Sequence, residues 1–271
     1  MTYLHACWEN SENSARVCAY SKEDVAALER QSIPKSILDR GRIPYSSLGN
    51  TKTNSVHKGG GVIATFSIPR HPLICVGATS ECFRRSYAIK ASRQYSRTRL
   101  ARMINYLLTF DPLFEQNMII SIKELQAKLG SRLVGYRIHE SGELYSQQYL
   151  NAWIQIARSI PRLRFACYTK ANGLNFSSVP QNMVILRSID VSTKKENVIP
   201  QYGDSTPYPS RYAISGLADT FEGYERENIP AEFSPNMRKE NVLDCPKHCA
   251  DCMFCYSSRT WPYKHVYFKW H

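Results

Sequence analysis

Four cysteines in the last thirty residues have the types and spacing that most clearly point to chemistry. Cys245, Cys249, Cys252 and Cys255 fall within eleven residues, in the spacing C-x3-C-x2-C-x2-C. Thiolates are soft ligands that select zinc or iron–sulfur centres. In a reducing compartment, nine cysteines with four in one cluster favour metal ligation over a disulfide framework. The cluster therefore predicts a metal centre.

The spacing of these four ligands bears on which metal they would hold. Zinc sites usually join two ligand pairs that are separated by a long gap, whereas ferredoxin-like runs wrap a larger cubane cluster with closely spaced thiols. The present run resembles the ferredoxin run C-x2-C-x2-C-x3-C in reverse. We therefore predict a [4Fe–4S] cluster, with zinc as the alternative. In either case His248 could replace one of the thiols.

Composition and charge limit the class of protein. The chain has 271 residues, of which 43% are hydrophobic, and this suits a large α/β domain with a sizeable core. No apolar run approaches membrane-spanning length, and the first residues carry no signal-peptide pattern. We therefore expect a soluble, cytoplasmic protein without membrane contact. A net charge of +12 favours anionic partners such as nucleic acid or nucleotides.

The chain divides into three predicted parts. Residues 1–60 read as an N-terminal accessory segment, 61–223 as an α/β core and 224–271 as a C-terminal segment that carries the cysteine cluster. Strands that alternate with helices predict parallel βαβ units. The units are too few for a closed eight-fold barrel, so we predict a partial (β/α) barrel or an open parallel sheet. Strands are expected within 61–68, 133–144, 162–170, 179–190, 210–219 and, as an edge strand, 265–271; helices are expected at 111–129 and 146–159.

Polar residues follow the predicted strands at the places where ligands bind in parallel α/β sheets. Gly142 would let the backbone approach a ligand closely, and Glu143 could accept hydrogen bonds from an ammonium group or hydroxyls. His139 could equally be a structural histidine. These residues predict a site at the carboxyl ends of the strands. Its members would be Cys75 and Cys82 in the first loop, Arg137, His139, Glu140, Ser141, Gly142 and Glu143 after the second strand, Tyr168, Thr169 and Lys170 after the third, and Ser188 and Asp190 after the fourth. Among them, His139, Glu140 and Lys170 are candidate catalytic residues, and Ser141, Gly142, Glu143 and Ser188 are candidate cofactor-binding residues.

Basic residues gather in segment 84–102. Between Phe83 and Phe110 there are seven Arg or Lys residues and no acidic residue, with Tyr87, Tyr95 and Tyr106 interspersed. The segment is either a solvated helix face or a surface that contacts the phosphates of a nucleic acid or nucleotide. The second possibility supports an alternative function, a zinc- or cluster-stabilised basic nucleic-acid-binding protein of a phage or mobile element.

Four sequence motifs of this chain together resemble those of one known family. The loop CVGATSEC followed by FRRSYAIK, the strand end YRIHESGELYS, the strand end YTK and the run CPKHCADCMFC resemble the "gene product eighty-eight" family of phages and bacteria. Members of that family typically carry C-P-G-A-x3-C-x3-C-Y-A in the first loop. The resemblance covers roughly Ile74 to Cys255, and it implies a phage or bacterial protein, which would act in the host cytoplasm if phage-encoded.

The same arrangement is similar to radical S-adenosylmethionine (SAM) enzymes. These place three cluster-binding cysteines after the first barrel strand and a Gly-Glu motif after the second, which holds the amino group of SAM. The likeness implies an iron–sulfur enzyme of that fold, with Cys75 and Cys82 binding a first cluster and Ser141, Gly142 and Glu143 lying at a SAM pocket. Ser86 stands where the family has its third loop cysteine, and Val76 where it has proline. Two thiolates and a hydroxyl hold such a cluster poorly, so this first site is expected to be impaired.

Overall fold

A computed structural model describes residues 26, 30–32, 35–39, 41–50, 52–171, 173–190, 193, 211–216, 240, 242–257 and 265–269. The strands are β1 (Ser46–Leu48), β2 (Val62–Phe66), β3 (Leu133–Ile138), β4 (Arg164–Thr169), β5 (Met183–Ile189), β6 (Arg211–Gly216), β7 (Val242–Asp244) and β8 (His265–Lys269). The helices are α4 (Lys35–Leu38), α5 (Ser80–Arg85), α6 (Tyr87–Gln94), α7 (Ser96–Leu108), α8 (Phe114–Leu129), α9 (Gln147–Ser159) and α11 (Cys249–Cys252). Short 3-10 helices lie at η1 (Gly130–Arg132) and η5 (Phe254–Tyr256).

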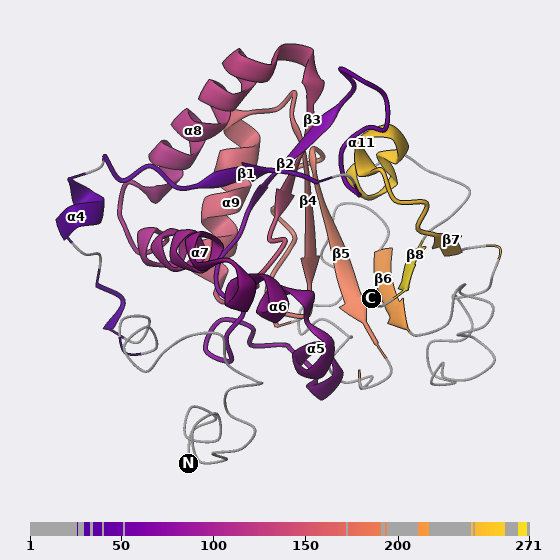
Figure 1. Cartoon of the computed structure of the whole chain (residues 1–271), viewed down its shortest axis with the longest axis horizontal. Helices are drawn as coiled ribbons and strands as arrows, with labels where there is room; N and C mark the ends of the chain where they lie inside the picture. The colour runs from indigo at the N-terminus through magenta and orange to yellow at the C-terminus, as the bar shows by residue number, and fades with distance from the viewer. Residues whose placement is uncertain are drawn as a thin grey trace.

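These strands form one open sheet in the order β1-β2-β3-β4-β5-β6-β8-β7 (Figure 1). Strand β1 is antiparallel to β2, and the other neighbours are parallel. The predicted α/β class and the open, mostly parallel sheet are confirmed, and the sheet does not close into a barrel. Strands that neighbour each other in sequence also pair along β2 to β6, as expected when helical crossovers return the chain beside its last strand.

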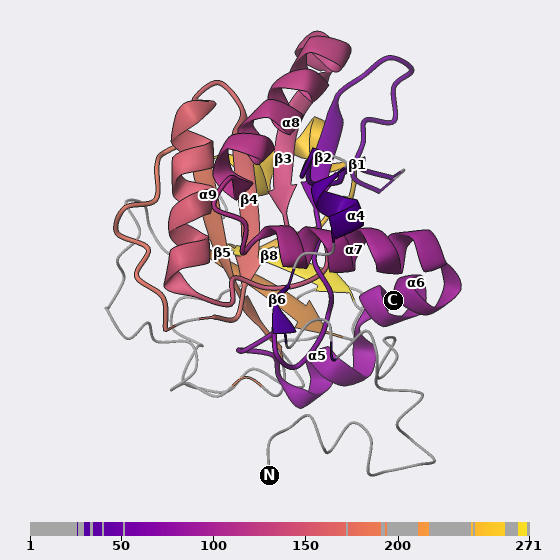
Figure 2. The same ribbon diagram turned by 90° about the vertical axis from the view of Figure 1, so that its left-hand side faces the viewer.

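Helices α7, α8 and α9 cover one face of the sheet (Figures 1 and 2). Trp153 of α9 is fully buried there, with ring centroids 5.4 Å from Phe66 and 6.1 Å from both Phe114 and Tyr136. Burying aromatic side chains of this size contributes on the order of 2–3 kcal/mol each. The amphipathic stripe of α9 thus anchors the middle of the sheet, and it holds the ends of β2 and β3 in register.

The opposite face of the sheet receives the cysteine segment. A Cβ atom on Gly135 of β3 would lie 3.0 Å from the ring of Tyr256, so the absence of a side chain lets this ring pack against the strand. The backbone amides of His248 and Ala250 donate to the carbonyls of Lys52 and Thr53, at 2.7 and 2.8 Å. The segment is therefore attached both to the sheet and to the loop that precedes β2.

The prediction that residues 265–271 form an edge strand is wrong. Strand β8 lies inside the sheet, between β6 and β7. Strand β1 comes from the predicted N-terminal segment, and β7 and β8 come from the predicted C-terminal segment, so all three predicted parts contribute to one sheet. Among the helices that the structure describes, none combines the length and the apolar character needed to cross a membrane.

Candidate functional site

The four clustered cysteines line a single hollow on the face of the sheet opposite α7–α9. The hollow is partly open to solvent. Cys255 is buried, and the other three thiols are half-buried. The four thiols share the hollow with Leu243, Pro246, Lys247, Met253, Phe254, Tyr256, Val266 and Phe268. A cluster that is contiguous in sequence is therefore enclosed by β7, by β8 and by its own apolar neighbours.

The backbone of the cysteine loop takes unusual conformations. Lys247, His248 and Met253 have φ values of 65°, 52° and 54°. These lie in the left-handed region of backbone conformation, which residues other than glycine rarely adopt. Each such residue costs on the order of 1 kcal/mol, and conformations of this kind gather at ligand-holding loops. The start of the loop is tied to the sheet, because the Cys245 amide donates to the Tyr267 carbonyl at 2.9 Å.

The thiols influence one another electrostatically. Burial raises the pKa of Cys245 to about 11, a hydrogen bond from the Lys247 amide opposes that rise, and the Cys249 and Cys252 thiols add to it. Burial likewise raises the pKa of Cys255, the Tyr168 hydroxyl opposes the rise through a hydrogen bond, and the other three thiols add to it. Ionising any one thiol therefore disfavours ionising the next, and a cation bound among them would remove this conflict.

The arrangement of possible ligands is specific in two respects. His248, predicted as a substitute ligand, does not line the hollow, whereas all four cysteines do. Within the described ranges, no three His, Cys, Asp or Glu side chains are arranged so that they could hold a metal ion as they stand. The fit to a metal group thus rests on the donor type and on the shared, largely apolar hollow.

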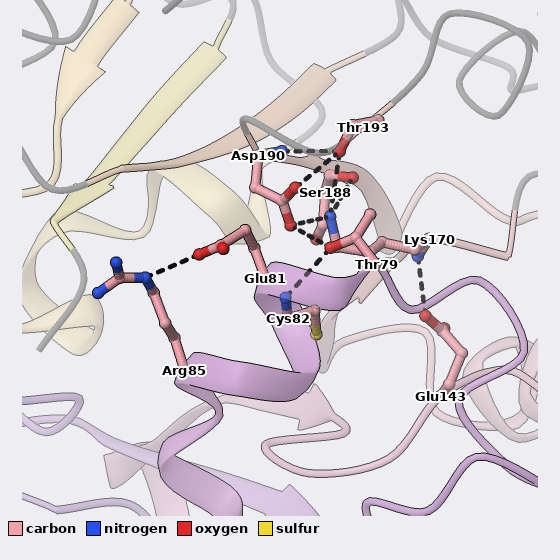
Figure 3. A network of polar contacts seen from close by, with 9 residues as sticks. All are labelled: Thr79, Glu81, Cys82, Arg85, Glu143, Lys170, Ser188, Asp190 and Thr193. Atoms are coloured by element: carbon pink, nitrogen blue, oxygen red, sulfur yellow. Dashed lines mark hydrogen bonds and ion pairs between the residues drawn. The ribbon is translucent and has the colours of Figure 1, made fainter. Parts of the chain in front are cut away.

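A second group of polar residues meets at the carboxyl ends of β4 and β5 (Figure 3). Thr79, the N-cap of α5, accepts a hydrogen bond from the Cys82 amide at 3.1 Å and donates to the Asp190 carboxylate at 2.7 Å. The same carboxylate oxygen forms an ion pair with the Lys170 ammonium at 2.9 Å. Lys170 also donates to the Ser188 carbonyl at 3.2 Å. The structure thus brings Cys82, Lys170 and Ser188 together, as the strand-end argument predicts.

Glu143 joins the end of β3 to the end of β4. Its buried carboxylate accepts hydrogen bonds from the Leu144 amide at 2.7 Å, the Thr169 hydroxyl at 2.6 Å and the Lys170 amide at 2.8 Å. Burial raises the pKa of Glu143, and these three hydrogen bonds oppose the rise. Both carboxylate oxygens of Glu143 accept hydrogen bonds from protein donors. In this structure Glu143 therefore connects the end of β3 to the end of β4.

Glycines at the strand ends serve close contacts within the protein. Gly142 has a φ of 102°, and a Cβ there would lie 2.2 Å from the Ile68 side chain. A Cβ on Gly77 would lie 2.1 Å from the Lys170 carbonyl oxygen, so the loop from Cys75 to Cys82 crosses directly over the end of β4. These contacts bring the loop thiols against the Glu143–Lys170 strand ends.

The other predicted strand-end residues surround this network. His139 is buried with a φ of 66°, and its Nε2 lies 2.8 Å from the Tyr149 hydroxyl. Burial, assisted by the Arg137 charge, lowers the pKa of His139 to about 3. Ser141 is buried and Glu140 half-buried. Cys75 and Cys82 are half-buried, and burial raises the pKa of Cys75 to about 12, with Glu143 and Cys82 adding to the rise.

Two members of the network were not predicted. Thr79 links the Asp190 carboxylate to the loop before α5. The Thr193 hydroxyl accepts a hydrogen bond from the Asp190 amide at 2.8 Å. Thr79 carries a recognisable signal, because a threonine that precedes a helix with Glu81 in its first turn is a typical N-cap.

The basic segment 84–102 is divided in its roles. Arg102 is buried and donates to the Ala88 carbonyl at 3.0 Å and the Ser92 hydroxyl at 2.8 Å, so it joins α6 to α7. Arg85 pairs with Glu81 at 2.8 Å. In this structure, the side chains of Arg102 and Arg85 therefore make contacts within the protein. The side chains of Lys90, Arg93 and Arg97 are exposed.

Fold and site together define an open-sheet α/β protein with a thiol-lined hollow on one face. The profile of the family described as Gene product 88 matches residues 44–258. The chain therefore belongs to the gene product 88 family, as the four motifs suggested. No curated protein and no solved structure matches it. The likeness to radical SAM enzymes receives no support from these comparisons.

Proposed function

We propose that this member of the gene product 88 family is an iron–sulfur protein in which Cys245, Cys249, Cys252 and Cys255 bind a [4Fe–4S] cluster. The observation that carries the proposal is that all four thiols line one hollow. A tetrahedral zinc site draws its four sulfurs to about 2.3 Å from one ion, whereas a cubane needs room between its ligands. Zinc remains the alternative occupant of the same thiols.

The chain's own residues define what such a centre can do. With all four positions taken by thiolates, no metal position is left open to a substrate. Met253, Phe254 and Phe268 give the hollow an apolar lining, and the Lys247 amide and the Tyr168 hydroxyl donate hydrogen bonds to Cys245 and Cys255. When bound, an iron–sulfur cluster supplies one-electron transfer, so the site supports electron transfer or a structural role.

SAM is not part of this proposal. In the radical SAM likeness, Glu143 would hold the amino group of SAM, yet its carboxylate already accepts three protein hydrogen bonds in a buried position. Ser86, at the position of the missing third cysteine, lies between α5 and α6. The strand-end residues therefore fit a network that fixes the loop between Cys75 and Cys82 better than they fit a SAM pocket.

Metal analysis of anaerobically purified protein tests the proposal. We expect about four iron and four sulfide per chain, the stoichiometry of the cubane, together with broad visible absorption. Cys252→Ser should lower the iron content, whereas Cys167→Ala, which removes a buried thiol of β4 that does not line the hollow, should not. About one zinc per chain without sulfide would overturn the iron–sulfur assignment and leave the thiol site as a zinc site.

Nucleic-acid binding is a second candidate function, and exposed cations support it. Lys90, Arg93 and Arg97 project from α6 and the start of α7. Figure 1 shows α6 apart from α11, so the two functions do not exclude each other. DNA or RNA binding that weakens with added salt, with a slope that reports several phosphate contacts, tests this function.

A further inference from the structure

The corner between α6 and α7 holds an exposed aromatic side chain. Tyr95 ends α6 and caps the start of α7, with φ −122° and ψ 100°, so the chain turns there without a loop. Its side chain is 54% exposed. The exposed ring offers an aromatic face on which a flat partner could stack.

The corner itself is held firmly. The buried Arg102 of α7 reaches back to the Ala88 carbonyl and the Ser92 hydroxyl of α6. Tyr95 is further tied in by its amide, which donates to the Ala91 carbonyl at 2.9 Å, and by its carbonyl, which accepts from the Arg99 amide at 3.1 Å. The ring is therefore presented by a fixed backbone, and this lowers the entropy that binding would cost.

Tyr95 lies in a segment of the sequence that is rich in basic residues. Lys90, Arg93 and Arg97 are exposed within five residues of it, and the sequence has no acidic residue from Cys82 to Phe110. The exposed Leu100 follows one turn further along α7. An exposed ring on a segment rich in exposed cations suits a ligand that has both flat faces and negative charge.

We infer that the Tyr95 corner binds single-stranded nucleic acid, with a base stacked on the Tyr95 ring and flanking phosphates on Lys90, Arg93 and Arg97. Stacking on aromatic side chains is sequence-tolerant, because every base has a π-face. In a duplex the base faces are already stacked, so a duplex could use the cations alone. The inference rests on the second candidate function and deepens it, and it does not depend on the metal centre.

Fluorescence anisotropy with a labelled single strand of ~15 nucleotides and the matching duplex tests the inference. We expect the single strand to bind more tightly than the duplex. Tyr95→Ala should weaken single-strand binding by about 5- to 150-fold, the range for losing one stacked base, and should leave duplex binding nearly unchanged. Tyr95→Phe keeps the ring and should retain affinity.

Two charge variants complete the design. Arg97→Gln should weaken both ligands and lower the salt slope by about one, as expected for one lost phosphate contact. Lys123→Gln, an exposed lysine on α8, serves as the matched control and should change neither. Equal binding of duplex and single strand, with no effect of Tyr95→Ala, would overturn the stacking inference while leaving nucleic-acid binding in place. No binding of either ligand, or binding to anionic lipid vesicles alone, would overturn both.

Discussion

The guanidinium carbon of Arg137 lies 4.7 Å from the centre of the Tyr168 ring. The two residues project from neighbouring strands, β3 and β4, and the Tyr168 ring in turn lies 5.8 Å from that of Phe268, which lines the thiol hollow. The Tyr168 hydroxyl hydrogen-bonds to Cys255, and the Arg137 charge lowers the pKa of Cys249 against the larger effect of burial. A cation and a hydroxyl therefore lie beneath the hollow on the sheet.

The Arg137 charge should tune a bound cluster. Reduction adds negative charge, so Arg137→Gln should lower the midpoint potential by roughly 50–90 mV, which is Coulomb's law for one charge at ~8 Å and an effective dielectric constant of ~20–40. The control is Arg132→Gln, at an exposed arginine just before β3, which should leave the midpoint potential unchanged. Potentiometric titration monitored by optical absorption measures both. An unchanged potential in the Arg137 variant would show that this charge lies too far away or is screened.

Asp190 should matter most for stability at the strand ends. Asp190→Asn leaves the Lys170 ammonium without its carboxylate, and the two side chains are only 12% and 1% exposed. Breaking a buried pair on one side costs about 3–5 kcal/mol of unfolding free energy. Glu81→Gln breaks the more exposed pair with Arg85 on α5 and should cost less than about 1 kcal/mol. Urea unfolding of the two variants compares these losses, and similar small values would contradict the role given to Asp190.

The hydrogen bonds of Glu143 predict a structural phenotype. Glu143→Gln keeps the shape but replaces one acceptor oxygen by an amide donor that would face the Thr169 hydroxyl or the Lys170 amide. We expect a loss of about 1–3 kcal/mol in unfolding free energy, the usual cost of an unsatisfied buried group. Added SAM should not raise the melting temperature of the unmodified protein. A SAM-dependent rise that Glu143→Gln abolished would instead assign a SAM site to these strand ends.

The loop after β2 can be tested by restoring the family's cysteine. Ser86→Cys supplies the third thiol of the family's motif in addition to Cys75 and Cys82, so a second cluster site should gain occupancy. We expect iron per anaerobically reconstituted chain to rise from about four toward about eight, because two cubanes would then be held. Ser80→Cys, at an exposed position on α5, is the control thiol. Equal iron in both variants would show that the loop holds no cluster.

Acid should destabilise the protein through His139. Its pKa is about 3 in the folded chain and ~6.5 when unfolded, so between these values the unfolded chain alone takes up the proton. The unfolding free energy should therefore fall as pH drops below ~6.5, by up to about 1.4 kcal/mol per pH unit from this residue. His139→Asn, which tolerates the left-handed backbone, should reduce the slope, and the exposed His57→Asn should not. Urea unfolding across pH measures it.

The parts of the fold that could be predicted are those whose signal is local. Apolar, β-branched runs and a 3.6-residue stripe suffice to place β2 to β6, α8 and α9, since each element buries a continuous face. Strand β8 shows where such signals fail. Val266 and Phe268 alternate with polar residues, as in a half-exposed edge strand, and only the pairing of β7 with the far side of β8 makes it internal.

The meeting of several strand-end residues could be predicted from the sequence, but their contacts could not. Strand ends gather at one edge of a parallel sheet, so the meeting of Lys170 and Ser188 follows from topology. The hydrogen-bond partners of Glu143 could not be predicted in this way, because Thr169 and Lys170 lie 26 and 27 residues away in sequence. From the sequence, Arg102 likewise looks like another surface cation. In the structure it is buried between α6 and α7, and this depends on how the two helices cross.

The place of β8 has a consequence for the order of folding. Strand β8 separates β6 from β7, although it follows both along the chain, and Val266 and Phe268 of β8 line the thiol hollow. Strand β7 therefore cannot join the sheet, and the hollow cannot close, until β8 has been inserted. A metal that is bound before that step would meet a loop exposed to solvent, and one bound after it would be enclosed. If the four thiols bind a cluster as proposed, metal binding and completion of the sheet are expected to be coupled.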